Sequence, residues 1–84
     1  MKTNYHLTLD LHGRRREEAL RLVGSQLYSA RNRGRSLLVV HGCGNGVLRQ
    51  AVRELAAGCP LVREIWFGEE YNLPGGSGVT AIFL

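Results

Sequence analysis

Cysteine is scarce and long apolar runs are missing from this sequence of 84 residues. Cys43 and Cys59 are too few for a disulfide framework or a zinc site, so we expect free thiols in a reducing compartment, by default the cytoplasm. No stretch approaches the roughly 20 apolar residues that cross a membrane, and the N-terminus has no signal-peptide core. We therefore expect no membrane partner. A chain this short predicts one domain, residues 1–84, with a shallow surface site rather than a large cavity.

Lysine is almost absent as well, because Lys2 is the only lysine among eleven basic residues. The net charge is nevertheless +4, and the arginines cluster at residues 14–16, 31–35 and 49–53. Arginine favours bidentate contacts with phosphate groups. The clusters predict a basic face for nucleic acid, RNA or DNA. The alternative is a solvated surface in which arginine reflects genomic base composition.

Residues 6–12 alternate between apolar and polar side chains, which is typical of a strand with one face on the core. Asp10 and His12 then share the polar face of that strand, with Cα atoms roughly 6.5–7 Å apart. Side chains at that separation can act on one bound group. The alternatives are that Asp10 bonds backbone amides and that His12 is an ordinary surface histidine.

Residues 15–33 show helical spacing of apolar residues, followed by Gly34 as the expected C-cap. Gly24 lies inside this predicted helix, where glycine costs about 1 kcal/mol relative to alanine. It lies on the same face as Leu20 and Leu27. We expect Gly24 to let the helix approach the sheet closely.

Residues 37–49 predict a buried strand, a tight glycine loop and the start of a helix. The strand spans Leu37 to Val40 or His41, and the helix runs from Asn45 or Gly46 to about residue 58. Such a junction exposes backbone N–H groups at a helix N-terminus, which favours an anion. The alternative is that the glycines only make a tight turn.

The remaining chain predicts strands at residues 62–67 and 79–84, joined by a glycine-rich loop. The complete order is β-α-β-α-β-β, which indicates an α/β two-layer sandwich. We expect a four-stranded mixed sheet with both helices on one face, right-handed parallel crossovers and an antiparallel final pair. The other sheet face would be open, so a monomer or a weak dimer is expected.

The predicted strand directions bring three segments to one edge of the sheet. Ligands of open α/β sheets bind outside the carboxyl ends of the parallel strands, and the final strand begins at that same edge. The polar and glycine residues gathered there are Asp10, His12, His41, Gly42, Gly44, Gly46, Gly75, Gly76 and Thr80. Two histidines and a carboxylate beside a loop that favours phosphate suggest phosphodiester chemistry.

Three segments, residues 9–13, 41–49 and 75–80, resemble the signature motifs of the Smr (small MutS-related) domain family. The resemblance implies a fold like the C-terminal domain of translation initiation factor three. It also implies nucleic-acid binding and, in many members, endonuclease activity on DNA or RNA. The chain departs from the family at Cys43, where lysine is common, and at Asn45, where threonine is common.

Together these residues predict an endonuclease, with RNA somewhat favoured over DNA. His12 would act as general base and Asp10 would orient it, while His41 would protonate the leaving oxygen or hold the phosphate with the loop amides. Flanking phosphates would be bound by Arg14, Arg15, Arg16 and Arg49. No cofactor is expected, although one carboxylate and two histidines could hold a divalent ion. The alternative function is a non-catalytic nucleic-acid-binding module that targets a fused or partner protein, such as a MutS-like protein, to branched DNA or to ribosomes.

Overall fold

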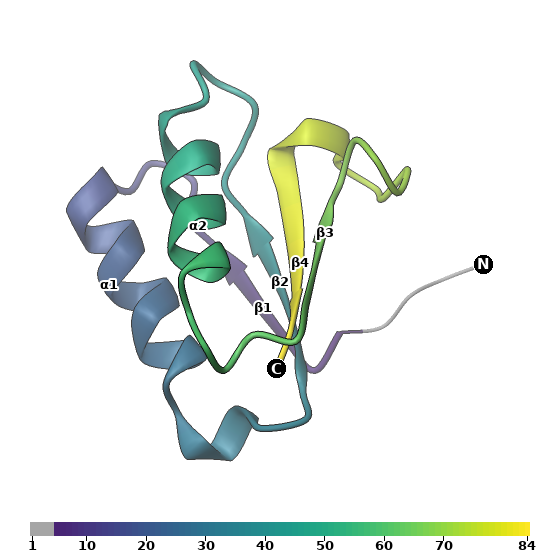
Figure 1. Cartoon of the computed structure of the whole chain (residues 1–84). Helices are drawn as coiled ribbons and strands as arrows, with labels where there is room; N and C mark the ends of the chain where they lie inside the picture. The colour runs from purple at the N-terminus through teal and green to yellow at the C-terminus, as the bar shows by residue number, and fades with distance from the viewer. Residues whose placement is uncertain (1–4) are drawn as a thin grey trace.

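The computed structural model describes residues 5–84, so Lys2 lies outside the described part of the chain. Its helices and strands follow the expected β-α-β-α-β-β order (Figure 1). Short 3-10 turns at Ala30–Asn32 and Gly76–Gly78 interrupt that order. The main elements are β1 (Leu7–Asp10), α1 (Arg16–Leu27), β2 (Ser36–Val40), α2 (Val47–Ala57), β3 (Glu64–Phe67) and β4 (Val79–Phe83).

The four strands form one mixed sheet in the order β1-β2-β4-β3. β1 and β2 are parallel, and β4 is antiparallel to both of its neighbours. Asp10 pairs with Val40, and Val40 pairs with Val79, so these three residues form one row across the sheet. This register brings the end of β1, the end of β2 and the start of β4 to one edge, as expected from the strand directions.

Both helices pack on the same face of the sheet, as predicted (Figure 1). The main core lies between them and the sheet. Its largest fully buried side chains are Leu11, Val23, Leu27, Leu37, Val39, Val52 and Ile82. Burial of such aliphatic side chains is the main source of stability in a domain this small.

The opposite face of the sheet carries a second, smaller apolar cluster around Leu73, Val79 and Ala81. Trp66 packs against this cluster and stacks on Tyr71, with ring centroids 4.6 Å apart and planes 5° from parallel. The segment after β3 therefore covers part of the face that we expected to be open. Dimerisation through that face stays a prediction.

The first helix is shorter than predicted, because it ends at Leu27 and not near residue 33. Asn32 is buried, and its side-chain amide donates to the carbonyl of Gln26 at 2.9 Å. That bond satisfies a helix-terminal carbonyl and folds the chain back into a 3-10 turn. The C-cap is Tyr28, so the prediction of Gly34 was wrong.

Gly24 lies in α1 as predicted, but a close approach to the sheet does not explain it. A Cβ atom added at this residue would meet no heavy atom within 4 Å. An alanine would therefore fit without displacing any neighbour. Among residues 5–84, no helix is both long enough and apolar enough to cross a membrane.

Candidate functional site

The end of β1 forms a tight turn that carries His12. The Asp10 carboxylate accepts a hydrogen bond from the backbone N–H of His12 at 2.9 Å, which is the geometry of an Asx turn. The strand consequently stops at Asp10, so the expected strand over residues 6–12 was too long. His12 lies on the turn and is exposed, rather than on the polar face of the strand.

Asp10 thus acts on the backbone at His12, which was one of the two roles considered from the sequence. The N–H of the intervening Leu11 donates to the carbonyl of Val40 at 2.8 Å. Leu11 itself is completely buried. The turn that presents His12 is therefore fixed to β2 on one side and to the core on the other.

The glycine loop connects β2 to α2 through two residues with positive φ, Gly42 at 82° and Gly46 at 83°. The Asn45 side chain accepts a hydrogen bond from the N–H of Val47 at 3.1 Å, at the first residue of α2. A Cβ atom at position 46 would lie 2.7 Å from the Arg49 guanidinium. The backbone conformation therefore favours glycine there, and a Cβ atom would also displace the flexible end of the Arg49 side chain.

The loop encloses a small cavity of about 130 Å³. Its lining consists of His41, Gly42, Gly44, Asn45, Gly46, Val47, Leu48 and Arg49. Helix N-termini carry unpaired N–H groups and a partial positive charge. The cavity therefore combines a helix N-terminus, glycine backbone and one arginine, a combination that suits a phosphate-sized anion.

His41 is buried and has a partner near each ring nitrogen. Nε2 lies 2.8 Å from the hydroxyl of Thr80, and Nδ1 lies 3.1 Å from the carbonyl of Gly42. Because a carbonyl only accepts, Nδ1 carries a proton, and in the neutral ring Nε2 accepts from the Thr80 hydroxyl. His41 therefore links the glycine loop to β4 through its neutral ring.

Burial lowers the pKa of His41 below its ordinary value of 6.5, and the nearby Arg53 and Arg49 charges lower it further. The hydrogen bond to Gly42 acts in the opposite direction and does not outweigh burial. The neutral form, in which Nε2 accepts from Thr80, is thus the form that the surroundings favour.

Arg53 extends this network to the surface. Its Nε donates to the Thr80 hydroxyl at 2.8 Å, and its two terminal nitrogens donate to the Glu69 carboxylate at 2.8 Å each. The guanidinium also lies 4.1 Å from the centre of the Phe67 ring. Hydrogen bonding to Arg53 lowers the pKa of Glu69 to about 2. Neither Arg53 nor Glu69 was predicted as a site residue.

The third predicted segment lies at the start of β4. Gly75 and Gly76 form the turn that enters the strand, and a Cβ atom on Gly75 would lie 2.7 Å from Val79. Gly78, which was not predicted as a site residue, accepts hydrogen bonds from the N–H groups of both His41 and Gly42 at 3.0 Å. This carbonyl ties the β4 turn to the glycine loop, whereas phosphate binding by Gly75 and Gly76 stays a prediction.

The arginines expected to bind flanking phosphates lie on two elements. Arg14, Arg15 and Arg16 precede or begin α1 and are exposed, and Arg14 pairs with Glu18 at 2.9 Å. Arg16 lines a hollow with residues of α2. Within residues 5–84, no group of three or more His, Cys, Asp or Glu side chains is placed to hold a metal ion.

The chain is similar in sequence and in structure to known domains. The sequence profile of the Smr domain matches residues 9–84. The chain belongs to the Smr domain family. The Smr domain of Thermus thermophilus MutS2 superposes with a TM-score of 0.78 at 37% identity, covering 92% of this chain and 95% of that one. The likeness to translation initiation factor three stays a prediction.

Curated relatives of this Smr domain are much longer proteins. Endonuclease MutS2 of Bacillus velezensis is 40% identical over 84 residues, which cover 96% of this chain and 10% of that protein. Endonuclease MutS2 of Aquifex aeolicus is 37% identical over 78 residues, covering 92% and 10% respectively. This chain therefore spans about a tenth of the length of the relatives it matches.

Position 43, where the resemblance to the family implies lysine, is a cysteine in this chain. Cys43 is exposed, and its Sγ atom lies 3.6 Å from the hydroxyl of Ser77. The loop consequently has no cation at this position. Arg49, on the first turn of α2, is the cation that lines the loop cavity instead.

Proposed function

We propose that this Smr domain binds nucleic acid and cleaves its phosphodiester backbone, with His12 as the general base. The names of its relatives, MutS2 proteins described as endonucleases or putative endonucleases and 40% identical, support this proposal. Conservation of fold with the Smr domain of T. thermophilus MutS2 supports it further.

The observation that carries the proposal is the position of the His12 turn beside the glycine loop. β1 and β2 are paired neighbours, and the row Asp10–Val40 is the last pair in their register. Adjacent strands lie about 4.8 Å apart. The exposed His12 and the cavity that begins at His41 thus follow neighbouring strands at the same edge of the sheet. This arrangement suits a base that acts on a bound phosphodiester.

The chemistry follows from these positions. A phosphate is held by loop amides and Arg49, while His12 removes a proton from a 2′-hydroxyl in RNA or from water in DNA. The activated oxygen forms a bond to phosphorus, and the bond to the leaving oxygen breaks. The leaving oxygen takes its proton from water, so in RNA the products are a 2′,3′-cyclic phosphate and a 5′-hydroxyl end. Asp10 positions the turn, and His41 positions the loop rather than donating a proton.

The test is cleavage of end-labelled RNA and DNA by the wild-type domain and by His12→Ala. His6→Ala is the matched control, because His6 lies before β1 at the opposite end of that strand. We expect His12→Ala to lower the rate by at least about a hundredfold and His6→Ala to leave it within a factor of three. Equal rates for wild type and His12→Ala would contradict the proposal. Parallel reactions with EDTA determine whether a divalent ion contributes.

A binding module without cleavage is the second candidate. The observation that favours it is that both ring nitrogens of His41 are engaged and that Asp10 bonds a backbone amide. Of the three predicted catalytic residues, His12 is then the one whose side chain makes no hydrogen bond within residues 5–84. This candidate predicts salt-sensitive binding without any product, even on long incubation. In that case the module would deliver a fused or partner protein, such as a MutS-like protein, to branched DNA or to ribosomes.

A further inference from the structure

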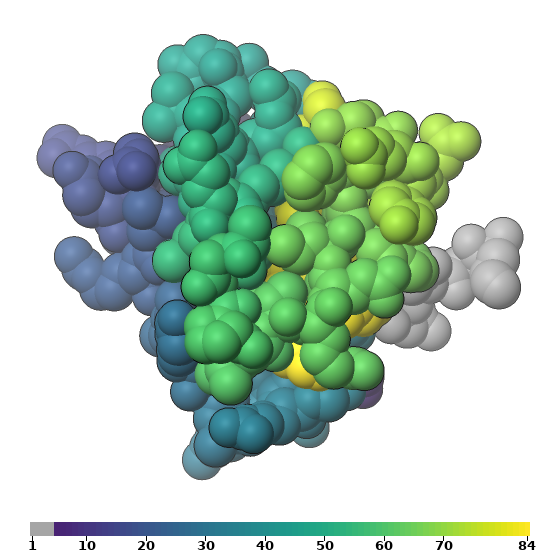
Figure 2. Space-filling view, viewed as in Figure 1, coloured from purple at the N-terminus to yellow at the C-terminus, as the bar shows by residue number. Residues whose placement is uncertain are grey.

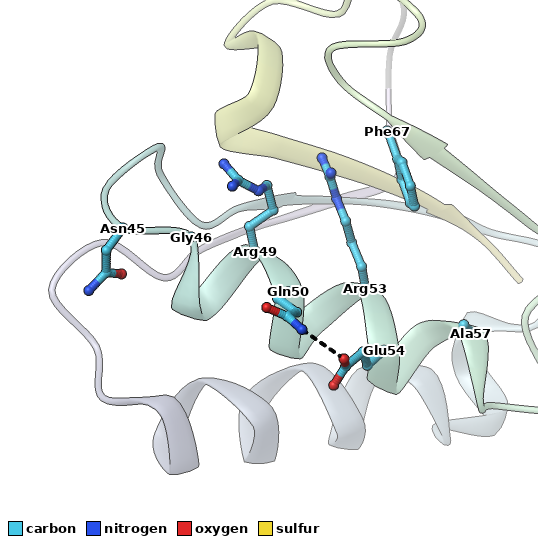
Figure 3. A pocket seen from close by; sticks show the side chains of 8 residues that line it. All are labelled: Asn45, Gly46, Arg49, Gln50, Arg53, Glu54, Ala57 and Phe67. Carbon is cyan, nitrogen blue, oxygen red and sulfur yellow. Dashed lines mark hydrogen bonds between the residues drawn. The ribbon is translucent and has the colours of Figure 1, made fainter.

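A groove runs along α2 on the side that faces β3, with a volume of about 440 Å³. Atoms of β4, in yellow, are visible between the green surfaces of α2 and the β3 segment in Figure 2. The lining residues of the groove that belong to α2 recur every three or four positions, so they form one stripe along that helix. The complete lining is Asn45, Gly46, Arg49, Gln50, Arg53, Glu54, Ala57 and Phe67 (Figure 3).

The groove is continuous with the cavity of the glycine loop. Asn45, Gly46 and Arg49 line both. Arg49 forms no ion pair with any carboxylate in residues 5–84, so its charge is available to a ligand. A chain of phosphates that enters the loop cavity can therefore continue past Arg49 into the groove.

The chemistry of Arg53 in the groove favours a planar ligand over a second phosphate. Four hydrogen bonds, to Thr80, Glu69 and the carbonyl of Val79, occupy the edge of its guanidinium. A guanidinium has five N–H donors, so few remain for phosphate oxygens. The guanidinium carbon lies over the Phe67 ring, 4.1 Å from its centre, so each plane covers one face of the other. Arginine planes and aromatic rings are the side chains on which unstacked nucleobases stack.

Polar side chains line the groove opposite the Arg53 guanidinium and the Phe67 ring. Gln50 donates to Glu54 at 3.1 Å, and both side chains are exposed along the helix (Figure 3). Amide and carboxylate groups can pair with the edge of a base. The volume falls within the range of about 300–1,000 Å³ typical of small-ligand sites.

We propose that the α2–β3 groove binds one unpaired nucleobase, next to the phosphate held by the glycine loop. This inference rests on the proposed function and adds the position and class of the flanking ligand. A base inside a duplex cannot reach such a site without leaving its stack. The groove therefore directs the domain to single-stranded or locally opened nucleic acid.

The experiment measures the dissociation constants of two fluorescent DNA hexamers of equal charge. One is hexathymidylate, and the other has an abasic sugar at every position. Ala57→Trp fills the far end of the groove from an exposed helix position. Ala30→Trp is the matched control, because Ala30 is also exposed but lies in the turn after α1. Circular dichroism and thermal unfolding confirm that each variant folds.

We expect wild type and Ala30→Trp to bind hexathymidylate about tenfold more tightly than the abasic hexamer. Ala57→Trp should bind both hexamers with the weaker, equal affinity. A preference for bases that Ala57→Trp retains would overturn the groove as the site. Equal affinities in the wild type would overturn base binding while leaving phosphate binding intact. Failure of both hexamers to bind would instead contradict nucleic-acid binding, on which the proposed function rests.

Discussion

Replacing Thr80 with valine tests the buried network that joins β4 to the glycine loop. Thr80 is completely buried, and its hydroxyl contacts both His41 Nε2 and Arg53 Nε at 2.8 Å. Valine nearly preserves the shape of the side chain but removes the hydroxyl. Two groups then lose a partner at once, one of them charged.

The expected loss follows from the cost of unpaired buried groups. A buried donor or acceptor left without a partner costs about 1–3 kcal/mol, and charged groups cost more. The Arg53 side chain is only 11% exposed, although it keeps its bonds to Glu69. We expect Thr80→Val to lower the free energy of unfolding by about 2–4 kcal/mol. This is a large share of the roughly 5–15 kcal/mol typical of small domains.

Urea unfolding monitored by circular dichroism measures this change, and Thr8→Val is the matched control. Thr8 lies on β1 with an exposed side chain, so the same substitution should change stability by less than about 0.5 kcal/mol. A Thr80→Val variant within 0.5 kcal/mol of wild type would refute the role of the hydroxyl in this network.

Three further predictions follow from the same geometry. Because the pKa of His41 is lowered in the fold, the unfolded chain binds more protons; stability should therefore fall as pH drops below about 6.5, a loss visible in urea midpoints. The lowered pKa of Glu69 predicts that wild type loses stability between pH 4.5 and about 2, and Glu69→Gln should remove this loss. If the free energy of unfolding of the variant fell with pH as in wild type, the prediction would be contradicted. Gly24→Ala should raise stability by about 0.5–1 kcal/mol, whereas Gly68→Ala, with a Cβ 2.0 Å from the Gly76 carbonyl oxygen, should prevent normal folding; thermal scans separate the two.

The strand directions were predictable because they depend on local patterns. The alternation of apolar and polar residues before Gly13 indicated a strand. The loop between the last two strands has no predicted helix, which indicated that these strands are antiparallel. Register then follows from burial of one face. These signals were enough to predict that His12, His41 and Thr80 lie at one edge of the sheet.

The end of the first helix could not be predicted from the same kind of pattern. Ala30 continues the apolar spacing beyond the residue at which α1 actually ends. The deciding contact is the bond from the buried Asn32 amide to the Gln26 carbonyl, which depends on how the chain folds back. Likewise, only the structure shows that the Asp10 carboxylate bonds a backbone amide.

The Arg53 network was missed because its partners are distant in sequence. Glu69 follows Arg53 by 16 residues and Thr80 by 27. One available signal was that Arg53 lies four positions after Arg49, and so on the same stripe of the second helix. That spacing indicated a second arginine beside the loop, although not that its hydrogen bonds would be directed inward.

The central position of β4 has a consequence for how the domain is made. β4 is the last strand in sequence, yet it lies between β2 and β3 and pairs with both. The β2 residue Val40 finds its antiparallel partner only at Val79. During synthesis, β2 and β3 therefore lack the strand that pairs with both of them until β4 has left the ribosome. The domain should fold in one late step, with its strand edges exposed to aggregation until then.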